Sequence, residues 1–395
     1  MGPHGGRIMG LARFFENRWL LAGTAVLLAL LWQTVIVTTR YGGNWTGLFY
    51  SGQYFSLPPE LEARTYRHPG SAGYDAQFYR LLAHDPLDLK GYSPYYDAAR
   101  YRRRRIAVPA LAWLLGFGQP RLIDYSYLAA IHLMIGAGVI LLSRLAVSYG
   151  RHPAWGAAFL VFPATLSGVA RLMPDFALGV VICGFLLWRQ ERRWWAWLLL
   201  AFGCLTRELG LLIVAAAAGQ ELWRRRWIPG ALWASAAAPA FAWWAGVSSG
   251  GGSAGSSGNY RWLGEHALIG FFERIASPVR YSEFRIADIV LQTSDAAAVL
   301  GLAAAAVAAV WCWWQNRDGD LEWLALAAAS LAVVAAHPVF LKDECSTARA
   351  YSLLVGPLAL IALRDGSRWL AVPLGLFSLR LTLGMAGVLL VQIFR

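Results

Sequence analysis

Charged residues, and lysine above all, are scarce in this chain. Asp, Glu, Lys and Arg make up 15% of its 395 residues, and Lys90 and Lys342 are the only lysines. Soluble domains carry about 25% charged residues, whereas 57% of this chain is hydrophobic and its mean hydropathy is +0.45. This composition excludes a soluble enzyme.

Cysteine is rare as well. The chain has four, Cys183, Cys204, Cys312 and Cys345, and no two of them have the CxxC spacing. We therefore predict neither a disulfide framework nor a zinc site, and we expect the first three to pack inside apolar segments. The apolar runs have helix length, which excludes an outer-membrane β-barrel.

The net charge of +12 comes from arginine. Most of the arginines lie at the ends of apolar segments, where they set membrane orientation and meet anionic lipid headgroups. This placement argues against nucleic acid as a partner and for a lipid bilayer. The heavy use of Arg, Ala, Gly and Trp is typical of a bacterial gene, so we expect a multi-pass protein of the bacterial inner membrane.

Recurring apolar runs predict an all-α polytopic membrane protein, with about 10 to 12 transmembrane helices and a large outer loop after the first helix. The segment 106–117 is too short to span, and we expect it to enter the membrane without crossing it. The predicted parts are a cytoplasmic N-terminus (1–18), a first transmembrane helix (19–38), an outer loop (39–105), a transmembrane module (106–247), a flexible outer loop with a surface helix (248–285), and C-terminal transmembrane helices (286–395).

The stretch Gly73–Pro109 of the outer loop is polar, aromatic and charged. It places Asp75 close in sequence to the arginine run 102–105. Carboxylates beside arginines suit a phosphate-bearing substrate, because one group accepts a proton while guanidinium groups hold an anion. Two alternatives stay open: the stretch is a solvated loop with a basic membrane-edge anchor, and Asp75 is an N-cap of a short helix.

Further polar residues interrupt the apolar segments, and the predicted topology places them on the same outer face. Ionisable groups at membrane depth are costly and usually face a cavity or a partner. Each also has a structural alternative: Asp175 as a helix N-cap, Arg207 with Glu208 as a local ion pair, and Asp343 with Glu344 as a solvated loop tip. The prediction of a site depends on their convergence.

Four motifs, in this order, carry a resemblance to a known family. They are GYDAQFYR in the outer loop, RRRRIAVPALAWLLGFG at the next apolar segment, MPDF, and LTRELGLL at a helix break. Together with the first helix, this order resembles the GT-C superfamily of membrane glycosyltransferases, in its protein-mannosyltransferase-like bacterial branch. The resemblance covers about residues 19–220.

The resemblance implies transfer of a sugar on the outer face, from a polyprenyl-phosphate-linked donor to a glycan or lipid acceptor. Asp75 would be the catalytic base. The candidate donor-phosphate-binding residues are Arg103, Arg104, Arg207 and Arg349. The candidate supporting or acceptor-binding residues are Tyr74, Asp175, Glu208, Asp343 and Glu344. No cofactor is required, although a divalent cation held by Asp75 and Asp175 stays open.

The alternative function is that of a non-enzymatic polytopic membrane protein, either a lipid-linked-sugar transporter or an assembly partner. Transporters bind near the bilayer midplane and often contain internal repeats. This chain has no clear repeat, and its polar interruptions cluster toward one face. Both features favour the enzyme.

Overall fold

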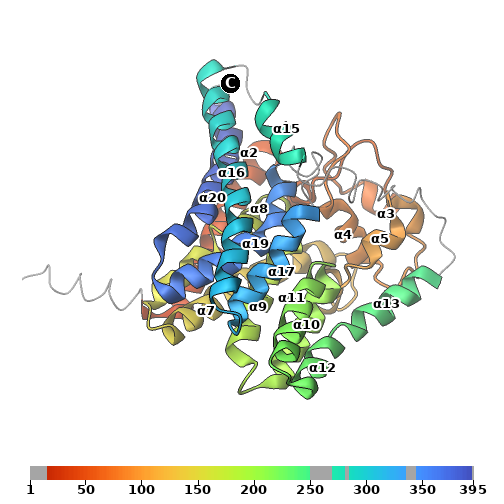
Figure 1. The fold of residues 1–395 in the computed structure, drawn as a ribbon. Coiled ribbons are helices and arrows are strands. Elements are labelled where there is room, and N and C mark those ends of the chain that lie inside the picture. The colour runs from red at the N-terminus through yellow and green to blue at the C-terminus, as the bar shows by residue number, and fades with distance from the viewer. Residues whose placement is uncertain (1–15, 250–268, 281–283, 335–343, 394–395) are drawn as a thin grey trace, which may run out of the picture.

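The computed structural model describes residues 16–249, 269–280, 284–334 and 344–393. Within these ranges the chain folds into helices, and its β-structure is limited to two isolated bridges, Ser51 with Gly73 and Gly52 with His68. The predicted all-α fold is therefore confirmed (Figure 1). Residues 250–268 and 281–283 of the predicted flexible outer loop with its surface helix (248–285) lie outside the described residues.

In the described part of the chain, five helices are long and apolar enough to cross a membrane. They are α2 (Arg18–Arg40), α7 (Ile123–Ser148), α16 (Arg285–Gln315), α19 (Glu344–Asp365) and α20 (Val372–Ile393). A sixth span arises if η3 (Pro153–Phe159) and α8 (Pro163–Arg171), which meet at 53°, act as one. The chain is thus a multi-pass membrane protein.

Shorter helices fill the space between these spans. They are α6 (Ala107–Leu115), η4 (Pro174–Phe176), α9 (Ala177–Trp188), α10 (Arg193–Thr206), α11 (Gly210–Trp223), α12 (Trp227–Ser235), α13 (Ala238–Ser249), α15 (Ile269–Ala276), α17 (Asp320–Val334) and η5 (Arg368–Ala371). At nine residues, α6 is about 14 Å long, far shorter than the roughly 30 Å hydrocarbon core. This length agrees with a segment that does not cross. The total of 10 to 12 spans stays a prediction.

The predicted outer loop (39–105) is a packed unit at one side of the helices (Figure 1). Its elements are η1 (Trp45–Phe49), α3 (Pro59–Glu62), α4 (Ala76–His84), η2 (Ser93–Tyr95) and α5 (Ala99–Arg103). Every residue of α4 is buried. Leu61, Phe78 and Tyr96 form part of a separate small core. A freely solvated loop would not bury such groups, so the solvated-loop alternative is wrong for this part of the chain.

One ion pair fastens the outer loop to the membrane helices. The Arg80 side chain, on α4, is 1% exposed and donates to both Asp124 oxygens, at 2.7 and 2.8 Å. Asp124 lies in the first turn of α7, where the helix dipole also favours a negative charge. The His84 Nε2 atom lies 3.0 Å from the same carboxylate. The orientation of α4 relative to α7 is thereby set.

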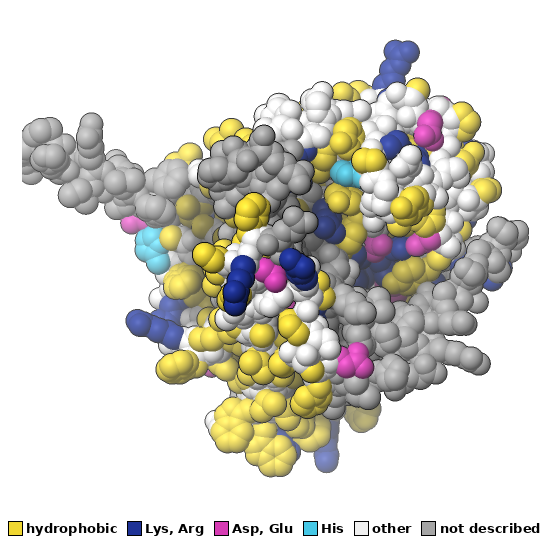
Figure 2. Space-filling view, turned by 90° about the horizontal axis from the view of Figure 1, so that it is seen from above, with side chains coloured by type: hydrophobic (Ala, Val, Ile, Leu, Met, Phe, Trp, Pro, Cys, Tyr) yellow, Lys and Arg dark blue, Asp and Glu magenta, His cyan; other side chains and the backbone are white. Residues whose placement is uncertain are grey.

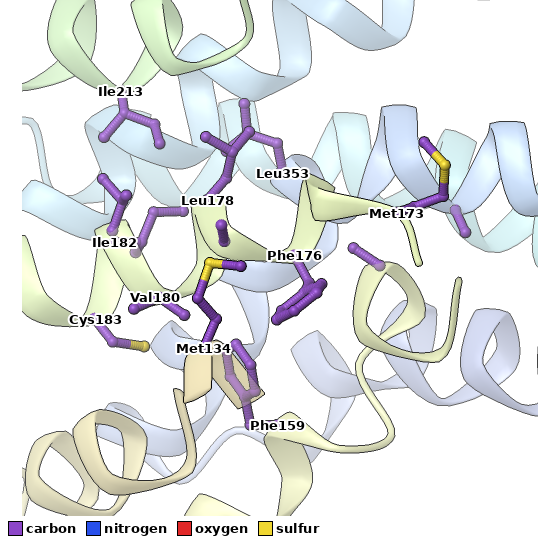
Figure 3. Packing of buried hydrophobic residues seen from close by; sticks show 14 of the residues in the cluster. Met134, Phe159, Met173, Phe176, Leu178, Val180, Ile182, Cys183, Ile213 and Leu353 are labelled. Atoms are coloured by element: carbon purple, nitrogen blue, oxygen red, sulfur yellow. The ribbon is translucent and has the colours of Figure 1, made fainter. Parts of the chain in front are cut away.

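Helix α9 lies in the core and begins two residues after Asp175. Its Leu178, Val180 and Ile182 pack in one cluster with Met134 of α7 and Ile213 of α11 (Figure 3). The Phe176 ring, just before α9, meets the Phe159 ring edge to face with centroids 6.3 Å apart. Apolar packing on several sides fixes the start of α9. It thereby also fixes the position of Asp175, which lies just before this helix.

The pair between Arg80 and Asp124 generates a stability prediction. Replacing Asp124 by Asn leaves the buried Arg80 charge uncompensated. We expect a loss of about 3 kcal/mol in the free energy of unfolding, the lower end for a broken buried pair, because 15% of the Asp124 side chain is exposed. Unfolding in detergent measures it. Arg100→Gln, on an exposed side chain, is the control, and equal stabilities of the two variants would contradict the prediction.

Candidate functional site

Asp75 stands at the N-cap position of α4 but does not cap it. Its backbone is helical, with φ −55° and ψ −29°, and its side chain makes no capping hydrogen bond. The carboxylate instead meets arginines: Oδ2 lies 2.7 Å from Arg349 Nη2 and 2.8 Å from Arg102 Nη1. The N-cap interpretation of Asp75 is therefore wrong, and its carboxylate points to a charged site.

Arg349, near the start of α19, joins the outer loop to the core. Its Nη2 donates to Asp75, and its Nε donates to Asp175 Oδ2 at 2.9 Å. The Asp175 side chain is 2% exposed and also pairs with Arg207, at the break between α10 and α11. Asp175 lies in η4, and α9 has Phe176 at its N-cap without a side-chain cap. The N-cap interpretation of Asp175 is wrong too.

Glu208 and Arg207 take different partners rather than forming a pair with each other. Glu208 Oε2 lies 3.0 Å from Arg105 Nη2. Arg105 is 3% exposed and also donates from Nη1 to the Tyr79 hydroxyl at 2.6 Å. Its Nη1 is 4.0 Å from Asp75 Oδ2. Arg105 therefore links the helix break at 207–208 to the outer loop.

The four arginines at 102–105 have partners in two different places: two contact the carboxylates of the site and two lie away from it. Arg102 reaches Asp75, and its Nε and Nη2 donate to both Asp97 oxygens at 2.8 and 2.6 Å. The predicted phosphate-binding pair lies apart: Arg103 pairs with Asp88 at 3.1 Å, and the Arg104 guanidinium lies 5.6 Å from the Trp244 ring centre. Arg102 lies in α5 and Arg105 just beyond its end, and both contact the carboxylates of the site.

The remaining predicted residues differ in what the structure describes. The Tyr74 hydroxyl lies 3.1 Å from Ser346 Oγ, and the Arg349 guanidinium is 5.4 Å from the Tyr74 ring centre. Tyr74 therefore belongs to the site. Asp343 lies outside the described residues. Glu344 is described only as the first residue of α19, and its side chain is not.

We call the group Asp75, Asp175, Glu208, Arg102, Arg105, Arg207 and Arg349 the arginine–carboxylate cluster. Its exposure is graded, because 22% of the Asp75 and 27% of the Glu208 side chain is exposed, against 2% for Asp175. Partial removal from water opposes ionisation of Asp75. The charges of Arg349, Arg102 and Arg105 outweigh it and hold the pKa of that carboxyl well below its usual range. Asp75 is thus a partly accessible carboxylate, ionised at neutral pH.

The Arg349 guanidinium lies between Asp75 and Asp175 and pairs with both. The sequence left open a divalent cation held by the same two carboxylates. Among the described side chains, no three His, Cys, Asp or Glu residues converge as metal ligands. Acidic and basic side chains also lie next to each other on the face seen from above (Figure 2). In this arrangement guanidinium groups face the carboxylates.

The sequence analysis did not single out Tyr79, and within the arginine run it chose Arg103 and Arg104, whereas the structure brings Arg102 and Arg105 to Asp75 and Glu208. One signal was present. Tyr79 follows Asp75 by four residues, the spacing that places two side chains on one helix face. The choice within the arginine run needed the backbone path from α5 to Arg105, which the sequence alone did not fix.

The fold and the arginine–carboxylate cluster together define an all-α multi-pass membrane protein with a buried, charge-compensated polar site at the ends of its helices. Comparison with protein-family models, with curated proteins and with solved structures finds no match. The function must therefore be argued from the site itself.

The bridge through Arg349 predicts energetic coupling. In a double-mutant cycle, Asp75→Asn and Arg349→Gln should deviate from additivity by about 0.5–3 kcal/mol in the free energy of unfolding, because each removes the other's partner. The matched control cycle combines Asp75→Asn with Arg103→Gln, whose partner is Asp88, and should be additive. Additivity in both cycles would show that the contact between Asp75 and Arg349 contributes nothing.

Proposed function

We propose that this protein is a membrane glycosyltransferase, which moves a sugar from a polyprenyl-phosphate-linked donor to an acceptor on the outer face of a bacterial inner membrane. The observation that carries the proposal is the position of Asp75. It is a partly exposed carboxylate, 2.7 and 2.8 Å from two arginines, and a second buried carboxylate holds one of them in place. A proton acceptor beside phosphate-binding groups is what this transfer requires.

The reaction balances with the groups present. The acceptor hydroxyl oxygen forms a bond to the anomeric carbon of the sugar, and its proton passes to Asp75. The bond between that carbon and the donor phosphate oxygen breaks, and the electron pair leaves with the polyprenyl phosphate. Guanidinium groups of Arg349 and Arg207 stabilise the charge that grows on this leaving group. A phosphate leaving group needs no strong general acid.

Because Asp75 is paired with Arg349 and Arg102, donor binding would also change the pKa of Asp75. With no donor bound, Arg349 and Arg102 hold the pKa of Asp75 low, which makes the carboxylate a weak base. A donor phosphate would compete for the same guanidinium groups and neutralise part of their charge. The pKa of Asp75 would then rise toward its ordinary value. Donor binding would in this way activate the base.

The graded exposure of the cluster supports an enzyme over a transporter. A transporter binds near the bilayer midplane and releases its substrate to either side. Here the accessible carboxylates, Asp75 and Glu208, belong to the outer loop and to the break at 207–208, while Asp175 behind them is 2% exposed. An acceptor would therefore approach Asp75 from the side of the loop 39–105, where its carboxylate is partly exposed.

Replacing Asp75 by Asn tests the base. We expect kcat to fall about 100-fold or more, while donor binding persists because the arginines stay. Transfer would be followed with a panel of polyprenyl-phosphate sugars and cell-envelope acceptors, using purified protein in lipid. Asp88→Asn is the matched control, because Asp88 is a loop carboxylate that pairs with Arg103 outside the cluster.

Two outcomes would count against this proposal. If Asp75→Asn transferred sugar at the wild-type rate, another group would have to accept the proton. If the wild type bound and consumed no donor of the panel, the non-enzymatic alternative would take its place.

Donor-dependent activation of Asp75 predicts two different pH profiles. The kcat/KM profile reports the free enzyme and kcat reports the donor complex. Positive neighbours lower the pKa of Asp75 in the free enzyme, so kcat/KM should show no acid limb from Asp75 between about pH 5 and 8. The bound phosphate raises this pKa, so the acid limb of kcat should lie at higher pH. Coincident limbs would contradict the activation step.

A further inference from the structure

A cavity lies toward the opposite end of α19 from the arginine–carboxylate cluster. Its volume is about 610 Å³, and residues of α7, η3, α9, α19, η5 and α20 line it. The interior is apolar, with Phe159, Ile182 and Leu360 among the lining residues. Phe159 and Cys183, both of which line it, appear in Figure 3. Pockets of about 300–1,000 Å³ hold ligands of the size of a drug.

One end of this cavity is basic. Arg151 and Arg368 both line it, and both are exposed. Arg151 is held in place by two hydrogen bonds, from Nε to the Leu363 carbonyl at 2.8 Å and from Nη2 to the Arg364 carbonyl at 3.2 Å. The Nη1 atom of Arg151 donates to no acceptor among the described residues. The Arg368 side chain likewise pairs with none of them.

Exposed tryptophans mark the same end as a membrane–water interface. Trp155, which lines the cavity, is 54% exposed, and Trp369, beside Arg368, is 84% exposed. Tryptophan gathers at the level of the lipid headgroups. The cavity therefore has its basic end at headgroup level, while its apolar interior lies between the membrane-spanning helices α7, α19 and α20.

This basic end is remote from the candidate active site. Arg349 and Leu363 lie fourteen residues apart on the continuous helix α19, which corresponds to about 21 Å along its axis. A donor whose phosphate meets Arg349 cannot place the same phosphate at Arg151. The ligand of this cavity is therefore a different molecule, or a different part of one.

We propose that the cavity binds one acyl chain of an anionic phospholipid from the cytoplasmic leaflet, with the lipid phosphate between Arg151 and Arg368. An apolar cavity between membrane-spanning helices is surrounded by the acyl chains of the bilayer lipids, so an acyl chain is the ligand at hand. Two guanidinium groups at its end select a negative headgroup, since basic pockets on the cytoplasmic side bind anionic lipids. The inference does not depend on the proposed glycosyltransferase function.

Native mass spectrometry of the full-length protein in detergent tests the site. Dioleoyl phosphatidylglycerol, dioleoyl phosphatidylcholine, a polyprenyl phosphate and inorganic phosphate are added separately. We expect the wild type to retain one phosphatidylglycerol in preference to phosphatidylcholine. Arg368→Gln should weaken phosphatidylglycerol binding about fivefold, the factor expected for one cation near a membrane surface. Arg144→Gln, also exposed on α7 but outside the cavity lining, should leave it unchanged.

A second variant tests the apolar part. Ala359 lines the cavity from α19 and is half-buried, so Ala359→Phe fills space that the acyl chain would occupy and should abolish retention of phosphatidylglycerol. Ala303→Phe, at an exposed position of α16, is the matched control. Arg368 is exposed and its side chain has no described partner, so Arg368→Gln keeps the test decisive even if Ala359→Phe fails to fold.

Three results would overturn the inference. Equal retention of both phospholipids, unchanged in Arg368→Gln, would remove the anionic headgroup site. Loss of polyprenyl phosphate but not of phosphatidylglycerol in Ala359→Phe would assign the cavity to the tail of an isoprenoid lipid. Inorganic phosphate that displaced phosphatidylglycerol from the wild type, and still bound Ala359→Phe, would assign the basic end to a free anion.

Discussion

The Arg349 guanidinium, shared by two carboxylates, is the interaction on which the arrangement of the site depends. It donates to Asp75 from the outer loop and to Asp175 from the start of the core helix α9. A buried charge without a partner costs several kcal/mol, so each of the three groups is stable only while the others are in place. The outer loop must therefore dock onto the membrane helices in one orientation, which the pair of Arg80 with Asp124 also favours.

Charge compensation inside the cluster also bears on function. Every arginine of the site already has a carboxylate partner, so an incoming anion must compete with an internal one. Such competition would change the surroundings of Asp75. Its pKa would rise when its arginine partners bind the incoming anion instead. The cavity at the other end of α19 differs, because Arg151 and Arg368 line it together with apolar side chains and Trp155, and no carboxylate is among its described lining residues.

Particular residues show how far sequence reasoning reached. The interruptions at Asp175, Arg207 and Glu208 stood out because ionisable groups are rare in apolar segments, and all three do meet in the cluster. The choice of Arg103 and Arg104 within a run of four arginines placed these residues at the site, but they point to Asp88 and Trp244 instead. The backbone path through the end of α5 and the residues after it decides this, and four identical neighbours carry no signal of that path.

The class of protein follows from the amino-acid sequence, because recurring apolar runs of helix length suit a bilayer. The sequence also determined which ionisable residues had to find partners, since the cost of burying a charge is local. Only the tertiary structure decided which partners they found. Asp75, Asp175 and Arg349 are separated by 100 residues or more along the chain, and ion pairing acts over a few ångströms. Their meeting depends on how every helix between them packs.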